Sequence, residues 1–328
     1  MKKIYSIVLI VTFIGMFQDG NAQLLDPKVD SLGRGFISNI QQKHYNFLNS
    51  CSLPMADSVC ILNIYGKNTK NALDNSKIAK FNNLTVLTIV GSFNRLPEVI
   101  FEMPNIKELR FVNITGLNWD STFKELSKIP QLKSLRIQSL SLDQLPNSIG
   151  LLTQLERLEI YYGYFKHLPD SFINLTNLKY INILYTNLTH LPTNYFNDNL
   201  LYLDISANRF NGMPKEINNF PELRYLRFID NKYLSSNDTI VCKNKKIENL
   251  NLSGCGIEKF PIGLICLPKL KGLALFDNRI PILPKEIENF KCLKILAVCM
   301  FNGQLVNLEY LSEKMPDCKF WTMPEINL

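Results

Sequence analysis

Two of the three histidines in the sequence share a local context and are the first side chains to consider for chemistry. His167 and His190 each stand directly before a Leu-Pro pair. If the two imidazoles lie on neighbouring turns, roughly 5 Å apart, they could begin a transition-metal site, because histidine nitrogen is a common zinc ligand. Gln144 and Gly212 hold the matching places on either side and supply no further strong ligand. The sequence therefore predicts no metal site.

Motifs that mark common enzyme classes are absent from the sequence. It has no G-x-S-x-G, no glycine-rich phosphate loop, no H-E-x-x-H and no closely spaced C-x-x-C. The segments outside the repeats described next, 23–58 and 318–328, are too short to add a catalytic domain. We therefore expect neither enzymatic activity nor a bound cofactor.

A repeat runs through most of the chain and must position any functional residue. The stretch "LERLEIYYGYFKHLPDSFINLTN" at 155–177 can be laid on "LKYINILYTNLTHLPTNYFNDN" at 178–199, with apolar residues at repeat positions 1, 4, 6 and 11. The alternation of Leu158 and Ile160 predicts a strand with one buried face, and the segment after Pro169 predicts a short helical or irregular return. Units start at Val59, Leu84, Ile106, Leu132, Leu155, Leu178, Leu200, Leu223, Ile247, Leu270 and Leu293, with a partial unit from Cys318.

A period of roughly 20–29 residues with this leucine frame is typical of leucine-rich repeats, and the chain resembles proteins of the LxxLxLxxNxLxxLPxxIxxL type. The resemblance implies an α/β solenoid, a horseshoe of about eleven repeats with a parallel β-sheet on its concave side. Some units depart from the pattern. The units from Ile106 and Leu223 lack the Leu-Pro pair, so we expect their outer walls to bulge. Asparagine holds its usual place only at Asn208, Asn231 and Asn278.

The first residues predict export. Residues 1–22 have a basic start, an apolar run and small residues before Gln23, which is the layout of a secretory signal peptide cleaved after Ala22. The apolar run is shorter than the roughly 20 residues of a membrane span, so we expect no transmembrane segment. These features predict a secreted, periplasmic or cell-surface protein. The composition, rich in Lys, Asn and Ile, is typical of a bacterial protein.

The predicted domain boundaries follow from these assignments. Residues 23–58 should form an N-terminal cap with an amphipathic helix over 36–48, residues 59–317 the repeats, and residues 318–328 a C-terminal cap. In that last segment we expect Trp321 and Met323 to occupy the buried register. The chain therefore reads as one repeat domain closed at both ends.

Eight cysteines in an exported chain suggest disulfides, although the sequence alone does not fix their pairing. Cys242 and Cys266 hold the same place in adjacent units, and Cys51 and Cys60 flank the entry to the first strand. Both pairs are candidate disulfides. Cys255 takes an asparagine position, where we expect a buried free thiol that packs as a small apolar residue.

Side chains at repeat positions 3, 5, 7 and 8 should face the inner surface or rim of the sheet. Tyrosine and arginine are frequent there, and these residues dominate binding hot spots. The predicted partner-binding residues are Arg110, Arg136, Arg157, Glu159, Tyr161, Tyr180, Tyr185, Tyr202, Asp204, Tyr225 and Arg227. The alternative is that the tyrosines only stabilise the sheet by cross-strand stacking.

The sequence favours a non-enzymatic module that binds a protein with its concave sheet. The formal net charge of +7 and a basic arc at Lys107, Arg110, Lys133, Arg136 and Arg157 predict a partner with an acidic or extended segment. No aromatic-basic nucleic-acid motif occurs, so we expect no nucleic acid partner. Carbohydrate binding or cell-surface adhesion stays open as the alternative, because tyrosine platforms also stack sugar rings.

Overall fold

The computed structural model describes residues 44–46, 61–66, 82–96, 98–232, 240–300 and 306–324. Residues Lys43–Glu325 belong to one compact unit. The predicted signal peptide, most of the predicted N-terminal cap and the candidate cystine Cys51–Cys60 lie outside the described residues. In the described part, no helix is long and apolar enough to cross a membrane.

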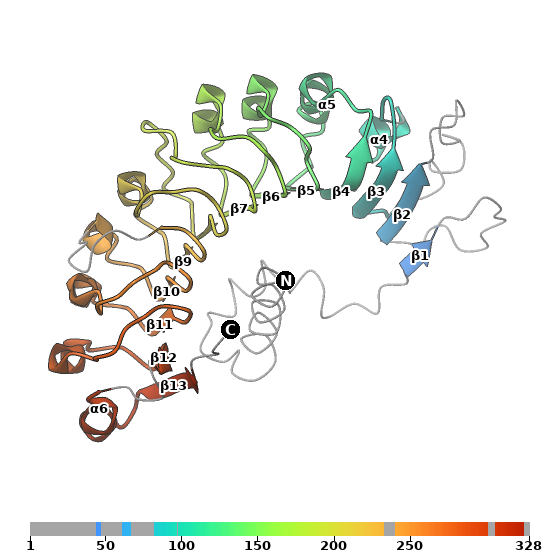
Figure 1. Ribbon diagram of the computed structural model, residues 1–328. Coiled ribbons are helices and arrows are strands. Elements are labelled where there is room, and N and C mark those ends of the chain that lie inside the picture. Colours follow the sequence, from blue (N-terminus) through green and yellow to red (C-terminus); the bar gives the residue numbers. More distant parts are fainter. Residues whose placement is uncertain are drawn as a thin grey trace. The chain divides into compact units, whose positions relative to one another are not determined.

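A single parallel sheet of 13 strands, in sequence order, runs through this part of the chain (Figure 1). Its strands are β1 (His44–Asn46), β2 (Ile61–Gly66), β3 (Val86–Ser92), β4 (Glu108–Thr115), β5 (Ser134–Gln138), β6 (Arg157–Tyr161), β7 (Tyr180–Leu184), β8 (Tyr202–Asp204), β9 (Tyr225–Arg227), β10 (Asn249–Asn251), β11 (Gly272–Leu275), β12 (Ile295–Met300) and β13 (Lys319–Pro324). The predicted leucine-rich repeat solenoid is confirmed, with one strand in each unit.

Short helices form the outer wall opposite the strands (Figure 1). They are α4 (Val99–Glu102), α5 (Trp119–Leu126), η3 (Asn147–Leu151), η4 (Asp170–Asn174), η5 (Lys215–Asn219), η6 (Ile240–Lys243), η7 (Ile262–Cys266), η8 (Lys285–Asn289) and α6 (Leu308–Lys314). The prolines of the repeat start many of these turns. The carbonyl of Pro169 accepts from the N–H of Phe172 at 2.9 Å, and Pro146 accepts from Ile149 at 3.1 Å. Proline fits there because its missing N–H would lack a partner at a helix start.

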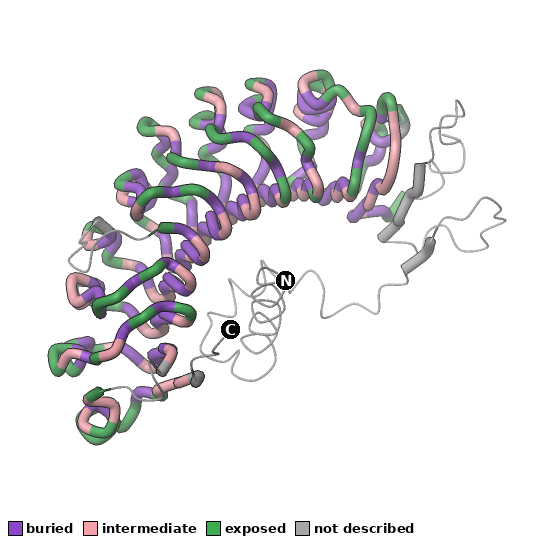
Figure 2. The backbone as a smooth tube through the Cα atoms, viewed as in Figure 1, coloured by how far each residue is buried: buried purple, intermediate pink, exposed green. Residues whose placement is uncertain are grey.

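The core lies between the sheet and this wall (Figure 2). The apolar positions 1, 4 and 6 of the repeat are fully covered; Leu155, Leu158 and Ile160, for example, each expose 0% of their surface. A single coil of the solenoid, which is one repeat unit, could not bury these side chains by itself. The folding of each coil therefore depends on its neighbours.

Asparagines at position 9 tie the turns together inside the solenoid. The amide of Asn208 donates to the carbonyls of Ile183 and Ile205 at 2.7 and 3.0 Å. Where Cys255 replaces asparagine, its thiol donates to the carbonyl of Phe228 at 3.1 Å. The predicted buried free thiol is confirmed, and burial raises its pKa to about 12.

The structure corrects two details of the sequence analysis. His44–Asn46 is a strand that pairs with β2, where we expected the end of a helix; the rest of that segment lies outside the described residues. In β13 the register is shifted by one residue, since Phe320 pairs with Leu296 and Trp321 pairs with Ala297. The prediction that Trp321 takes a buried strand position is therefore wrong, because the unit before it is shorter than we counted.

The unit from Ile106 has a different outer wall, as its missing Leu-Pro pair suggested. Residues Trp119–Leu126 form α5, an α-helix where most units have a single tight turn. The side chain of Asn118 caps it by accepting from the N–H of Ser121 at 3.0 Å. Trp119 packs its ring edge to face on Phe111 at 5.4 Å and fills the larger space under the helix.

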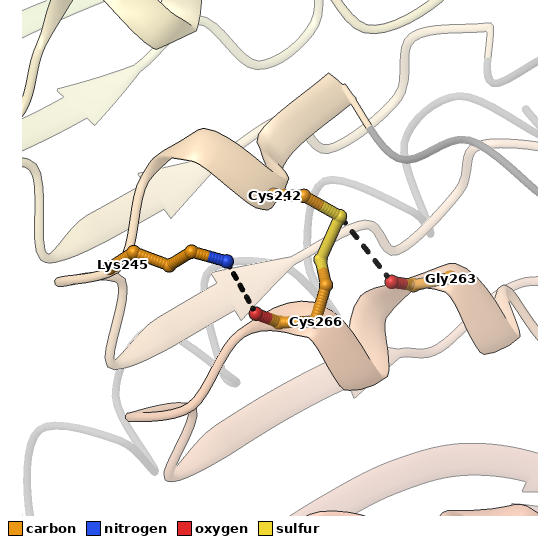
Figure 3. The surroundings of a disulfide bond; sticks show 4 residues. All are labelled: Cys242, Lys245, Gly263 and Cys266. Atoms are coloured by element: carbon orange, nitrogen blue, oxygen red, sulfur yellow. Dashed lines mark hydrogen bonds between the residues drawn. A yellow bond between two sulfur atoms is a disulfide. The ribbon is translucent and has the colours of Figure 1, made fainter.

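The predicted pairing of Cys242 with Cys266 is confirmed. The two cysteines link η6 to η7 on the outer wall, and the ammonium of Lys245 donates to the carbonyl of Cys266 at 3.3 Å (Figure 3). The disulfide joins the unit from Leu223, which lacks a Leu-Pro pair, to the unit from Ile247. It therefore reinforces the wall where the repeat pattern is weakest.

Removing this disulfide should destabilise the repeats. Cys242→Ser/Cys266→Ser should lower the free energy of unfolding by about 3 kcal/mol, because the bond closes a loop of sequence separation 24 in the unfolded chain. Urea unfolding followed by circular dichroism measures the change. Cys292→Ser, at a free cysteine, is the control and should unfold like the native chain.

Candidate functional site

A row of stacked side chains crosses the inner sheet at repeat position 3. The register pairs Arg157 of β6 with Tyr180 of β7, Tyr202 of β8 and Tyr225 of β9. The guanidinium of Arg157 lies 4.1 Å from the Tyr180 ring centre, and the Tyr180 and Tyr202 rings are 4.1 Å apart and nearly parallel. Tyr202 and Tyr225 follow at 6.3 Å. The predicted alignment of these four residues is confirmed.

The members of this row differ in exposure. Tyr180 and Tyr202 are half-buried, whereas Tyr225 is 5% exposed and offers little surface to a partner. Burial is also the largest cause that raises the pKa of Tyr180 and of Tyr202 above the ordinary value. The open part of the row is therefore Arg157, Tyr180 and Tyr202, which we call the tyrosine row.

A charged cluster lies beside the row at position 5. Glu159, 2% exposed, pairs with Arg136 at 2.8 Å and with Arg157 at 3.2 Å, and accepts from the hydroxyl of Tyr161 at 2.8 Å. Burial opposes ionisation of Glu159, but the two guanidiniums and the hydroxyl outweigh it and hold its pKa below the ordinary value. Asn182 continues the cluster by donating to the Tyr161 hydroxyl at 3.0 Å.

A second pair follows on the next strands. Asp204, 2% exposed, lies 3.2 Å from Arg227, and its other oxygen accepts from the backbone N–H of Ser206 at 3.0 Å. Glu159, Asp204 and Tyr225 were predicted to contact a partner. Each is covered by its neighbours, so these three side chains support the surface and expose little of it.

The predicted basic arc is partly neutralised inside the protein. Arg110 pairs with Glu108, and Lys133 lies 3.7 Å from Glu156. Arg136 and Arg157 share Glu159 as described above. Sequence reasoning counted the basic residues at these positions but missed that carboxylates on the same or next strand face them. Long-range attraction of an acidic partner is weaker than the arc alone suggested.

Repeat position 8, at or near the end of each strand, has a backbone feature that the sequence analysis missed. Its residues adopt a left-handed conformation in unit after unit, with φ near +50 to +70° at Asn113, Ser139, Tyr162, Tyr185, Ala207, Asp230, Gly254 and Asp277. Glycine, asparagine and aspartate tolerate this conformation best, so their recurrence at position 8 was the available signal. Two tyrosines hold it as well, and their rings stack at 5.0 Å.

The two histidines lie where the repeat predicted. The rings of His167 and His190 are 4.5 Å apart and exposed. Among the described residues no group of three or more His, Cys, Asp and Glu side chains could hold a metal ion.

Comparisons with known proteins support the fold. No family model and no curated protein matches the sequence. Among solved structures, a leucine-rich repeat protein of Leptospira interrogans is 18% identical, with TM-score 0.52 over 89% of this chain and 97% of its own. An internalin of Listeria monocytogenes is 15% identical, with TM-score 0.57 over 82% of this chain and 76% of its own. TLR13, in its complex with ssRNA13, is 20% identical, with TM-score 0.61 over 79% of this chain and 39% of its own.

The protein is thus a leucine-rich repeat protein by fold, as its sequence predicted. Its inner sheet carries the tyrosine row and the paired charges beside it. A repeat scaffold with an ordered, partly exposed inner face is an architecture for macromolecular interaction.

Glu159 should be essential to the stability of this surface. Glu159→Gln should lower the free energy of unfolding by about 3 kcal/mol, because it leaves two arginines close together without their shared carboxylate. Urea unfolding of both proteins at neutral pH measures this. Glu156→Gln, at a partly exposed glutamate paired with Lys133 and Lys179, should cost no more than about 1 kcal/mol; an equal loss in both variants would contradict a special role for Glu159.

Asp230 should make stability depend on pH. Burial, followed by the charge of Asp277, raises its pKa from 3.8 to about 6, so the folded chain holds this proton more tightly than the unfolded chain. Its contribution to stability is present below about pH 4 and is lost as the pH rises through about 6. Asp230→Asn should therefore add about 1–2 kcal/mol to the free energy of unfolding at pH 8, allowing for partial exposure.

The pH series provides its own control for that variant. At pH 4 the native chain and Asp230→Asn should unfold at nearly the same urea concentration, because the native carboxyl is then neutral as well. Asparagine also tolerates the left-handed backbone at this position. A difference that is constant from pH 4 to pH 8 would show that Asp230 is an ordinary exposed carboxylate.

Proposed function

We propose that the protein is a non-enzymatic binding module that holds an extended segment of a protein partner against the tyrosine row. The observation that supports this most directly is the stack of Arg157, Tyr180 and Tyr202, ordered side chains that stay partly exposed. Tyrosine and arginine bury a large area on binding and lose little conformational freedom when they are already held in place.

The geometry favours a protein over a carbohydrate at this row. Sugar rings bind tyrosine by lying on an open ring face. Here the faces of Tyr180 and Tyr202 lie against each other at 4.1 Å, and Arg157 covers the next face at 4.1 Å. Both tyrosines are nevertheless partly exposed, and an exposed part of a tyrosine that is not an open ring face suits backbone and side-chain groups of a peptide.

The partly neutralised arc bears on the kind of partner. Because Arg110, Arg136 and Arg157 already have carboxylate neighbours, acidic residues of a partner would share these arginines with them. We therefore infer that the extended shape of the partner segment contributes more to binding than its acidic residues do. With the signal peptide predicted from residues 1–22, we propose that binding takes place outside the cytoplasm, in a secreted, periplasmic or surface-attached form.

The proposal predicts a selective loss of binding. Tyr180→Ala/Tyr202→Ala should weaken capture of the partner at least about 30-fold, because two residues at the centre of the contact are removed. The purified chain and the variant would be used as bait for cell-surface and culture extracts, and retained proteins identified by mass spectrometry and then titrated.

A matched variant on the outer wall separates this effect from a general loss of structure. Ile173 and Phe196 are exposed there, so Ile173→Ala/Phe196→Ala should retain the same partner as the native chain. Circular dichroism checks that both variants are folded. A partner held equally by the inner-face variant would place the contact elsewhere and refute the proposal.

A further inference from the structure

One acidic side chain on the binding side of the protein has no basic partner among the described residues. Glu159 and Asp204 each have an arginine neighbour. Asp230 differs: no basic group in the described ranges lies within ion-pair distance of its carboxylate. Burial and Asp277 raise its pKa to about 6, which reflects an environment without a counter-ion.

Asp230 belongs to the row of side chains at repeat position 8, along the edge where the strands end. From β5 to β11 this row reads Ser139, Tyr162, Tyr185, Ala207, Asp230, Gly254 and Asp277. Gly254 makes room for the acidic side chain, since a Cβ there would lie 2.1 Å from Asp230 Oδ1. The carboxylate thus lies over a residue without a side chain.

The aromatic pair Tyr162 and Tyr185 comes earlier in the same row, with Ala207 between it and Asp230. Tyr162 and Tyr185 stack at 5.0 Å with 14° between their planes. The next residue in the row after Tyr185 is Ala207, whose methyl group is too small to cover a phenol ring. No other ring in the described part of the chain stacks on Tyr185, which is half-buried. Asp230 also acts on it: after burial and Tyr162, its charge helps to raise the pKa of Tyr185.

The spacing between coils fixes the size of the gap. Neighbouring parallel strands lie about 4.8 Å apart, so Tyr185 and Asp230, two coils apart, are separated by about 10 Å along the row. A flat group stacked on Tyr185 would lie over Ala207, with the carboxylate of Asp230 beyond it. A cation on an aromatic face is attracted by the ring, and more strongly when a carboxylate is near.

We propose that the gap over Ala207, between the Tyr185 ring and the Asp230 carboxylate, binds a long basic side chain of a protein partner, with arginine fitting best. The aliphatic stem of the side chain would pack on the ring, and the charged end would extend along the row to pair with Asp230 and approach Asp277. This deepens the proposed function and rests on it only in taking the partner to be a protein. The site lies at the rim, separate from the tyrosine row.

An arginine explains the combination of groups better than a metal ion. Calcium binds roughly six to eight oxygen ligands and magnesium about six. At this place in the row the acidic groups are Asp230 and Asp277, which are too few to hold either ion. A ring face about 10 Å from a carboxylate selects a long side chain with an apolar stem and a charged end, and the guanidinium of arginine also matches the geometry of a carboxylate. The other charged groups nearby, Asp204 and Arg227, already pair with each other.

The test uses a ligand that does not depend on finding the natural partner. N-acetyl-arginine amide and its neutral isostere N-acetyl-citrulline amide would be titrated into the full chain, with ligand-observed NMR reporting the dissociation constants. The native chain should bind the arginine compound at least about 5-fold more tightly. Asp230→Asn and Tyr185→Ala should each remove most of that preference, whereas Tyr185→Phe should keep it.

Control variants make each outcome decisive. Asp170→Asn, at an exposed carboxylate on the outer wall, should leave the preference unchanged. Alanine occurs naturally in the left-handed conformation at Ala207, so Tyr185→Ala is expected to fold. Equal binding of the two compounds by the native chain, no measurable binding of the arginine compound, or a preference that survives in Asp230→Asn would each overturn the proposal.

The result is independent of the tyrosine row. Tyr180→Ala/Tyr202→Ala should bind the arginine compound like the native chain, because neither residue lines the gap. Loss of the partner with that variant, together with no preference for arginine, would refute the rim site and leave the proposed function standing. The reverse result would refute the function and keep the site.

Discussion

The parallel hydrogen-bonded register between successive strands is the constraint on which the rest of the structure depends. Each coil is too small to bury its own leucines, so it folds only where the next coil covers them. The register aligns each repeat position with the same position one coil away; Tyr180, for example, stands beside Tyr202 and not beside its neighbours. Every side chain therefore belongs to a row with a spacing of about 4.8 Å.

That spacing decides which side chains can follow one another in a row. Flat aromatic rings and asparagine amides gain contacts from it, which is why Tyr180 and Tyr202 stack and why Asn208 can bond to the turn before it. Like charges repel each other at this spacing, because two carboxylates or two guanidiniums at the same repeat position would lie side by side. Arg110 and Arg136 are neighbours in one row and persist because Glu108 and Glu159 lie against them.

The fold could be predicted from the sequence because the leucine frame is repeated many times and each unit repeats the same evidence. The rows could be predicted for the same reason, down to Cys242 beside Cys266. Exposure could not, since Tyr202 and Tyr225 hold the same repeat position on neighbouring strands, yet Tyr202 is half-buried and Tyr225 is only 5% exposed. The sequence also did not show which charged side chains form ion pairs. The pairing of Arg157 with Glu159, for example, depends on side-chain direction and not on repeat position. The error at Trp321 arose where the last unit lost the leucine pattern that fixed the others.

The row at position 8 shows how one backbone requirement shapes a surface. A left-handed residue is needed there so that the chain can turn away from the sheet, and small or polar residues meet that need at low cost. Tyr162 and Tyr185 meet it at a higher cost, since bulky residues rarely adopt positive φ. The stacking of the two rings offsets part of that cost. It does not explain why the small residues Ala207 and Gly254 occur later in the row. Packing alone does not explain a row in which large rings are followed by small residues and by a carboxylate without a basic partner. A bound basic side chain would contact the ring face and pair with the carboxylate.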